Sequence, residues 1–436
     1  MAAGFEGFEV TWRKDVFGGA PQEGSAAGFG TLGVNFRARK PTGGSRRADA
    51  PASSRKGSAR AAGAGAAATR TDIDAGTLRD KLERGEPVAV LDVRKADQRA
   101  EWSIPGSVHF DAYDALNAGD ERAMEGLDLP EGAPVATVCG RGRSSATAAE
   151  QLRRKGYEAF SLEGGMRAWS LAWNTAKVSV AGAEAQVVQV RRTGKGCLSY
   201  LVGSGEEAAV IDPAVDPEVY AELAEERGWR IAHVLDTHVH ADHLSRSRML
   251  AELTGAKLHM PEGAPVSYPF SPLGDGDEIP IGATRLRALR TPGHTAESTS
   301  YLLDGKALFT GDTLFLSAVG RPDLEASPER AREKARALHG SLRRVLKLDP
   351  ETLVLPGHTG EPVPFDEEPV AAALSEVQEG IPLLGEGEET FVEILARHAP
   401  PPAENYERIV KLNRAGEQPE GDPTELEAGA NRCAVG

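Results

Sequence analysis

Short apolar runs separated by glycine- and proline-rich turns recur along most of the chain and predict two regions of mixed helix and strand. In the first region, the runs VAVLDV from Val88 and VATV from Val135 have the length and composition of buried strands. Residues 78–82 show a helical pattern that stops at Gly85. Strands that alternate with helices predict a parallel sheet with helices on both faces.

In the second region the apolar runs end in loops that are rich in histidine. Ile231, Val234 and Leu235 form a predicted buried strand, and the following loop crowds three histidines and two aspartates into the stretch LDTHVHADHL. The ligand-type side chains of that loop and of three later strand-end loops are His238, His240, Asp242, His243, His294, Asp312 and His358. Imidazole and carboxylate together suit zinc, iron or manganese rather than calcium or magnesium, and the ligand types do not choose among those three.

This ordered series of motifs resembles the metallo-β-lactamase fold as it occurs in glyoxalase II and the persulfide dioxygenases. The motifs are HxHxDH, a later histidine, an aspartate in TGD and a final PGH, and they cover about residues 186–359. The resemblance implies two β-sheets packed face to face, helices outside them and a metal at one edge of the sandwich.

A reactive cysteine is predicted in the first region. The strand from Val135 runs into Cys139, which is followed by two glycines, Arg141, Arg143 and a helix that ends near Gly156. Loop amides, the positive end of the helix dipole and the arginines all favour thiolate over thiol.

The loop CGRGRS resembles the active-site loop of a rhodanese domain, and VLDVR, IPGSVHF and LEGGMRAW stand in the expected order around it. Trp102 and Ser103 stand where that family often has Gly-His. The resemblance implies sulfur transfer: Cys139 takes a sulfane sulfur, holds it as a persulfide under the loop amides and passes it to an acceptor thiol.

The length of 436 residues predicts two or three domains. Residues before about 70 are rich in Gly, Ala, Ser and Arg and offer little apolar surface to offset the entropy of ordering. The expected organisation is a disordered tail (1–70), a rhodanese-like doubly wound α/β domain (72–174), a metallo-β-lactamase αββα sandwich (185–415) and a C-terminal tail (416–436).

Composition favours small-molecule partners. With 65 acidic and 50 basic residues the net charge is −15, which opposes broad attraction to nucleic acid or anionic membranes. No apolar run has the length of a membrane span and no secretory pattern opens the chain, so we expect a cytoplasmic protein. Three widely spaced cysteines argue against a disulfide framework.

The resemblance leaves two reactions open at the metal. In the glyoxalase II-like, hydrolase reading two zinc ions activate a water that attacks a thioester. The first zinc is held by His238, His240 and His294, the second by Asp242, His243 and His358, and Asp312 bridges them. In the dioxygenase reading a single Fe(II) is bound by His238, His294 and Asp312, and the other four side chains support these ligands. A third reading, a sulfur carrier or redox sensor with a non-catalytic metal, predicts no turnover with O₂.

The neighbouring domain favours the dioxygenase. A domain that makes or relays persulfide has a chemical reason to be fused to one that oxidises persulfide, which places the chain in sulfide oxidation. The expected partners are a glutathione-like thiol or persulfide, thiosulfate or another sulfide-derived sulfur donor, and O₂, with sulfite as product. The oligomeric state stays open, a homodimer included.

Six further positions bear on the predicted site. Arg321 and Asp323 in VGRPDL are expected to form a salt bridge that supports the metal loops, in preference to binding the substrate directly. Cys197 is either an inert buried cysteine or one that faces the substrate. Cys433, in an ending similar to that of persulfide dioxygenases, is a candidate to fold back near the site. Gly360 and Val319 stand where the best-known persulfide dioxygenases have a tyrosine and a cysteine, which leaves the thiol substrate open.

Overall fold

The computed structural model describes residues 6–14, 33–39, 71–129, 132–398, 400–403 and 405–435. The chain divides into two units, residues 1–67 and 68–436. In the first unit β1 (Glu6–Lys14) pairs antiparallel with β2 (Gly33–Arg39). This pair differs from the tail without structure that the composition predicts. Apolar and polar residues alternate in EGFEVTWRK, a strand period that the overall composition hides. The other residues of 1–70 lie outside the described part of the chain.

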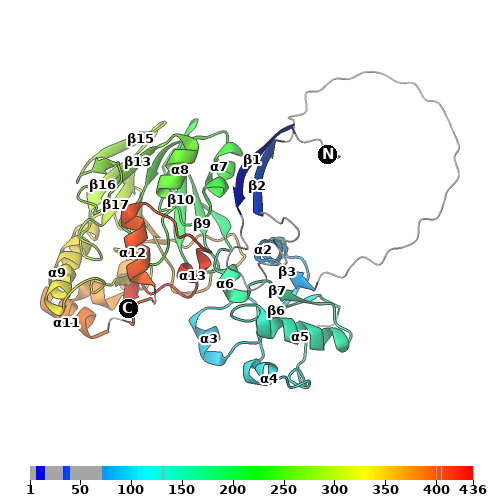
Figure 1. Cartoon of the computed structure of the whole chain (residues 1–436). Coiled ribbons are helices and arrows are strands. Elements are labelled where there is room, and N and C mark those ends of the chain that lie inside the picture. Colours follow the sequence, from blue (N-terminus) through cyan, green and yellow to red (C-terminus); the bar gives the residue numbers. More distant parts are fainter. Residues whose placement is uncertain are drawn as a thin grey trace, which may run out of the picture. The chain divides into compact units, whose positions relative to one another are not determined.

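The second unit begins with a five-stranded parallel sheet (Figure 1), in the order β3-β7-β6-β4-β5. Its strands are β3 (Asp72–Ile73), β4 (Ala89–Asp92), β5 (Val108–His109), β6 (Val135–Val138) and β7 (Ala159–Leu162). Its helices are α2 (Ala75–Glu83), α3 (Ala96–Glu101), α4 (Tyr113–Asn117), α5 (Arg143–Arg154) and α6 (Gly165–Trp169). Leu91 packs with residues of α4 and α5, whereas its neighbour Val90 packs with residues of α2 and α6. Helices therefore cover both faces, as predicted.

Two larger sheets follow. The first has the order β14-β13-β12-β11-β10-β9-β8 and the second the order β15-β16-β17-β18-β20-β21. The strands of the first are β8 (Asn174–Val178), β9 (Gln186–Arg191), β10 (Leu198–Ser204), β11 (Glu207–Ile211), β12 (Arg230–Leu235), β13 (Lys257–Pro261) and β14 (Ser271–Leu273). Those of the second are β15 (Glu278–Ile281), β16 (Thr284–Arg290), β17 (Thr299–Leu303), β18 (Ala307–Gly311), β20 (Leu353–Pro356) and β21 (Ala372–Ala373).

The two sheets pack face to face around one apolar core. Tyr200 of β10 meets Phe309 of β18 with ring centroids 4.9 Å apart. On the outside, α7 (Pro217–Glu225) and α8 (Ser247–Thr254) cover the first sheet. The second is covered by α9 (Pro328–Val345), α10 (Leu374–Gly380), the 3₁₀ turn Pro382–Gly385 and α11 (Glu388–His398). This is the predicted αββα sandwich.

The end of the chain returns to the sandwich. It forms α12 (Tyr406–Ala415) and α13 (Thr424–Glu427), and then β22 (Ala434–Val435), which pairs antiparallel with β19 (Val319–Gly320). Because β19 follows the loop of Asp312, the pairing brings residues 431–435 to the histidine-rich edge.

The parallel-sheet domain and the sandwich meet along the turn between β9 and β10. The indole of Trp102 is 3% exposed, and its Nε1 donates to the carbonyl oxygen of Thr193 at 3.0 Å. A Cβ on Gly194 would lie 1.9 Å from the carbonyl oxygen of Trp169, so only glycine allows this approach of the two backbones. Trp102, at a position where the rhodanese resemblance expects Gly-His, is thus an interface residue.

Among the helices of the described residues, none combines the length and the apolar character needed to cross a membrane.

Candidate metal centre

The predicted ligand-type side chains come together at one edge of the sandwich. His238, His240, Asp242 and His243 lie in the loop after β12, and His294, Asp312 and His358 lie in the loops after β16, β18 and β20. Every one of the seven is at most 3% exposed. Strands of the two sheets end at this edge, which is why loops far apart in sequence meet here.

His238, His294 and Asp312 form one group, whose candidate ligand atoms all lie within 4.8 Å of one another. Asp312 Oδ2 lies 3.8 Å from His238 Nε2 and 3.6 Å from His294 Nε2. The Nδ1 atoms are engaged elsewhere: that of His238 with the Thr237 hydroxyl at 2.9 Å, and that of His294 with the carbonyl oxygen of Arg321 at 2.9 Å. These contacts orient both rings so that Nε2 faces the carboxylate.

The chemistry of this group fits a divalent metal ion. His238 Nε2 and Asp312 Oδ2 are buried, and neither has a hydrogen-bond partner among the described residues. Such an orphaned polar atom costs roughly 1–3 kcal/mol unless a partner, here a cation, satisfies it. Burial and repulsion by His240 hold the pKa of His238 well below its ordinary value, and burial lowers the pKa of His294 despite Asp312. Both imidazoles are therefore neutral and keep a lone pair for a metal.

His240 lies in a second group with Asp212 and Asp236. Its Nε2 donates to Asp212 Oδ1 at 3.2 Å, while its Nδ1 is buried without a partner among the described residues. Asp212 also accepts from the backbone N–H and the hydroxyl of Thr237, at 2.7 and 2.8 Å, and so fixes the start of the histidine loop.

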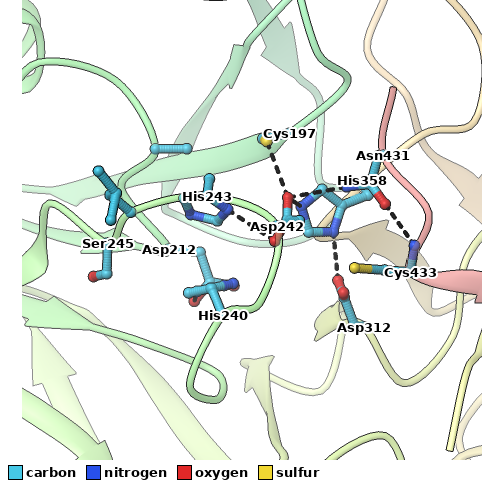
Figure 2. Close-up of polar contacts among 12 residues, drawn as sticks. Cys197, Asp212, His240, Asp242, His243, Ser245, Asp312, His358, Asn431 and Cys433 are labelled. Atoms are coloured by element: carbon cyan, nitrogen blue, oxygen red, sulfur yellow. Dashed lines mark hydrogen bonds and ion pairs between the residues drawn. The ribbon is translucent and has the colours of Figure 1, made fainter. Parts of the chain in front are cut away.

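Asp242, His243, His358 and Cys197 make a third group (Figure 2). His243 Nδ1 lies 3.1 Å from Asp242 Oδ1, and His358 Nδ1 lies 2.5 Å from Asp312 Oδ1. His358 Nε2 is 2.8 Å from Asp242 Oδ2, but the two groups are not aligned for a hydrogen bond. His358 therefore connects the carboxylate of the first group to that of the third.

Cys197 is buried within this third group, with its thiol 3.4 Å from Asp242 Oδ2. Burial and Asp242 raise the pKa of the thiol, but His243 and His358 outweigh them and lower it to about 6. Of the two expectations for Cys197, the structure supports the burial but places the thiol among ligand-type side chains.

The C-terminal segment covers the same edge. Asn431 Nδ2 donates to Asp242 Oδ2 at 3.1 Å, and Asn431 Oδ1 accepts from the backbone N–H of Cys433 at 2.8 Å (Figure 2). Cys433 is 3% exposed and forms a further group with Asp312 and His358. Cys433 therefore lies beside the histidine-rich edge, as expected if the end of the chain folds back near the site.

Arg321 and Asp323 form the salt bridge expected from the sequence. Arg321 Nε and Nη2 donate to the two carboxylate oxygens of Asp323 at 2.8 and 2.7 Å. Arg321 also holds His294 through its carbonyl oxygen and the C-terminal segment through Nη1, which donates to the carbonyl oxygen of Arg432 at 2.9 Å. The pair thus links a ligand loop to the segment that covers it.

In the parallel-sheet domain, Cys139 lies at the end of β6, directly before the loop that leads into α5. Its sulfur accepts from the backbone N–H of Gly142 at 3.1 Å and from the hydroxyl of Ser145 at 3.2 Å. A Cβ on Gly165, at φ +60°, would lie 2.2 Å from the Cys139 carbonyl oxygen, so α6 packs directly under the loop. Arg141 and Arg143 are exposed, and neither has an ion-pair partner within the described ranges.

Comparison with known families matches both regions. Residues 192–358 match the metallo-beta-lactamase superfamily, and residues 74–172 match the rhodanese-like domain. This chain joins a rhodanese-like domain to a metallo-β-lactamase domain.

Several curated relatives are similar to the metallo-β-lactamase domain. A hydroxyacylglutathione hydrolase of Acidiphilium cryptum is 36% identical over 162 residues, which is 37% of this chain and 63% of that protein. One of Methylococcus capsulatus is 38% identical over 164 residues, 36% of this chain and 58% of that protein. The chain therefore spans less than two thirds of the length of these relatives.

Two solved structures are also similar. A metallo-beta-lactamase of Staphylococcus aureus has a TM-score of 0.49 at 28% identity, covering 54% of this chain and 73% of that one. ETHE1 of Myxococcus xanthus has a TM-score of 0.47 at 31% identity, covering 53% of this chain and 98% of that one.

Three residues beside the two sites were not predicted from the sequence: Ser145, Asp212 and Asn431. Asp212 carried a signal, since it ends the apolar run EAAVIDP just as Asp236 ends the run before the histidine loop. Ser145 lies on α5, directly after the motif CGRGRS, and Asn431 lies two residues before Cys433 in the C-terminal segment.

Proposed function

We propose that the metallo-β-lactamase domain is an iron-dependent persulfide dioxygenase, and that the rhodanese-like domain supplies it with sulfane sulfur. The observation that carries this proposal is the grouping of His238, His294 and Asp312. Two histidines and one carboxylate form the ligand set of mononuclear non-haem iron oxygenases. His240, Asp242 and His358 fall into other groups, where they contact carboxylates or the C-terminal segment.

Fe(II) held by His238, His294 and Asp312 would supply open positions for O₂ and for the terminal sulfur of a persulfide. The overall reaction consumes a persulfide anion, O₂ and water, and it releases the parent thiol, sulfite and a proton. The chain's own residues orient these ligands. His358 holds Asp312 Oδ1, the carbonyl oxygen of Arg321 fixes His294, and Asn431 and Cys433 cover the edge and limit access of water.

The sulfurtransferase step rests on the surroundings of Cys139. Its thiolate attacks the outer sulfur of thiosulfate, the S–S bond of the donor breaks, and sulfite leaves with the bonding electrons. The N–H of Gly142 and the hydroxyl of Ser145 point at the sulfur and stabilise negative charge both before and after the transfer. A fused domain that forms persulfide is of direct use to a persulfide oxidase and of no evident use to a thioester hydrolase.

One alternative has specific support. The curated relatives reported above are named hydroxyacylglutathione hydrolase. In addition, His240 Nδ1 is buried and has no partner in the described part of the chain, while its Nε2 is held by Asp212. A histidine oriented by a carboxylate in this way is typical of a metal ligand. With His240 in the first set, and Asp242, His243 and His358 in the second, the edge would suit a two-zinc thioester hydrolase.

Paired assays separate these functions. O₂ uptake and sulfite release are measured with glutathione persulfide, and hydrolysis of S-lactoylglutathione is measured with the same preparation. The dioxygenase proposal expects O₂ uptake matched by sulfite, with slow or no thioester hydrolysis. Rapid hydrolysis without O₂ uptake would establish the alternative instead.

A further inference from the structure

A cavity of about 540 Å³ lies where the rhodanese-like domain meets the metallo-β-lactamase domain. Its walls include Gly140 and Arg141 of the cysteine loop, Lys195 of the turn between β9 and β10, and Asp242 of the histidine loop. The C-terminal segment closes it with residues 424–426 and 428–430. The volume lies within the range of about 300–1,000 Å³ that is typical of small-molecule sites.

The cavity adjoins both reactive sites. Gly140 and Arg141 directly follow Cys139, whose sulfur carries the transferred atom in the proposed function. Asp242, which also lines the cavity, contacts Cys197 and Asn431 and lies 2.8 Å from His358, the residue that holds Asp312. A molecule bound in this space therefore lies against the loops of both sites.

Most cations in the wall have carboxylate partners. Arg94 pairs with Asp92 at 2.7 Å, Arg167 with Asp422 at 2.7 Å, and Arg432 with Glu101 at 2.9 Å. These pairs neutralise much of the wall, so the side chains that lack such a partner decide which ligand charge the cavity favours.

Lys195 is one of those side chains. It is 2% exposed, its Nζ donates to the carbonyl oxygen of Gly429 at 3.4 Å, and within the described part of the chain no carboxylate forms a salt bridge with it. A buried ammonium without an anion is costly, by several kcal/mol. Arg141, which is exposed and has no ion pair among the described residues, adds a second free cation to the same wall. Of the carboxylates in the wall, Glu101 and Glu425 pair with Arg432 and Arg167, and Asp242 lies against His243 and His358. The two cations without such a partner therefore make the cavity favour an anion.

We propose that this cavity binds a low-molecular-weight thiol that carries a carboxylate, with Lys195 and Arg141 as the partners of that carboxylate. The bound thiol takes the sulfur from Cys139, and the persulfide that forms reaches the group of His238, His294 and Asp312 without leaving the protein. This inference rests on the proposed function, because it names the carrier between the two sites.

The transfer step balances without an added oxidant. The thiolate of the bound molecule attacks the outer sulfur of the Cys139 persulfide and forms a new S–S bond. The bond between Cys139 Sγ and that sulfur breaks, and Cys139 leaves as a thiolate, which accepts hydrogen bonds from the N–H of Gly142 and the hydroxyl of Ser145. The product is the persulfide anion that the dioxygenase reaction consumes.

The first test compares two acceptor thiols in the thiosulfate sulfurtransferase assay. Lys195→Met keeps an apolar stem but removes the charge, and Lys195→Arg restores a cation. For Lys195→Met we expect the KM for glutathione to rise about tenfold or more relative to the KM for uncharged 2-mercaptoethanol, since a hydrogen bond to a charged group is lost. Lys195→Arg should recover most of the difference.

An equal change of both KM values in Lys195→Met would mean that the lysine only supports the fold, and would overturn the anion site. This assay measures only the sulfurtransferase activity of the rhodanese-like domain, which needs no metal. Its outcome is therefore independent of whether the metallo-β-lactamase domain oxidises persulfides.

The second test asks whether the carrier stays bound. O₂ uptake from thiosulfate and glutathione is followed in the wild type and in an equimolar mixture of Cys139→Ser and Asp312→Ala, which together hold one working copy of each site. We expect uptake without a lag in the wild type and a lag that lengthens on dilution in the mixture. Ala428→Trp, which places an indole in the cavity wall from an exposed position, should produce the same lag.

The matched control is Ala283→Trp, at an exposed alanine in the turn between β15 and β16, which should behave as the wild type. Equal lags in the wild type and the mixture would overturn the retention of the carrier. Absence of O₂ uptake from preformed glutathione persulfide in the wild type would instead refute the proposed dioxygenase. The Lys195 variants would still test whether the cavity binds an anionic thiol.

Discussion

Glu427 connects the C-terminal segment to the histidine loop, and its replacement by glutamine tests how that segment is held. Its carboxylate is fully buried. Oε1 accepts from the backbone N–H of Leu244 at 2.6 Å, and Oε2 accepts from Arg192 at 3.2 Å and from Arg246 at 3.1 Å. Glutamine keeps the shape and one acceptor, but it leaves two buried guanidinium groups without an anion.

The two arginines hold the carboxylate of Glu427 in its charged form. Burial raises the pKa of Glu427, but Arg192 and Arg246 outweigh it and lower the pKa from 4.5 to about 2. At about 1.36 kcal/mol for each pH unit, this difference corresponds to roughly 3 kcal/mol of stability. Removing one partner of a buried ion pair typically costs about 3–5 kcal/mol. We expect Glu427→Gln to lower the free energy of unfolding by about 3 kcal/mol at pH 7.

The lowered pKa of Glu427 also determines how the stabilisation changes with pH. Because the folded-state pKa is below the unfolded one, the stabilisation is fully present above pH 4.5 and is lost as the pH falls towards 2. The assay is urea unfolding of the wild type and the variant at pH 7 and at steps below pH 4.5. Their difference should narrow as the pH falls.

Glu425→Gln is the matched control in the same helix. The side chain of Glu425 is 66% exposed and its ion pair with Arg167 is 3.1 Å long, so its loss should cost less than about 1 kcal/mol. If Glu427→Gln is no less stable than Glu425→Gln, or if its deficit stays constant below pH 4.5, the buried pair does not hold the segment.

Three further predictions concern the two sites and their interface. Cys139→Ser should abolish thiosulfate sulfurtransferase activity, because a hydroxyl cannot carry sulfane sulfur, while O₂ uptake from preformed glutathione persulfide continues; loss of both would refute separate sites. His358→Ala should retain iron and lower O₂ uptake by roughly 10- to 100-fold, as expected for a residue that orients a ligand. Loss of a second zinc ion from this variant in metal analysis would show that His358 binds metal itself. Trp102→Ala should lower the unfolding free energy by about 3–5 kcal/mol in urea titrations, since the 3% exposed indole fills the domain interface; a change below about 1 kcal/mol would show that the interface does not depend on it.

The fold and the ligand-type residues were accessible from sequence because both depend on local pattern. Buried strands have a recognisable apolar run, and the strands that carry His238, His294, Asp312 and His358 all end at one edge of the sandwich. The cysteine loop was accessible for the same reason, since Cys139 stands between a strand and a helix in a glycine-rich turn. Local pattern thus predicts which side chains meet.

The features that could not be predicted from the sequence depend on contacts between distant segments. Asp212 approaches Thr237 only because β11 pairs with β12 in the register Ile211 to Leu235. Lys195 is buried only because the turn between β9 and β10 lies against the rhodanese-like domain. The two-residue strand β22 has no period of its own, and it is ordered by pairing with β19. Both reactions at the metal draw on the same seven motif residues, so the motifs alone do not separate them.

The metal content of the protein, purified without added metal, tests the central claim most directly. Elemental analysis is run on the wild type and on Asp312→Ala, which removes the only anionic side chain of the group of His238, His294 and Asp312. A persulfide dioxygenase of the proposed kind holds one iron per chain, and that iron is lost in Asp312→Ala. Two zinc ions per wild-type chain would contradict the account.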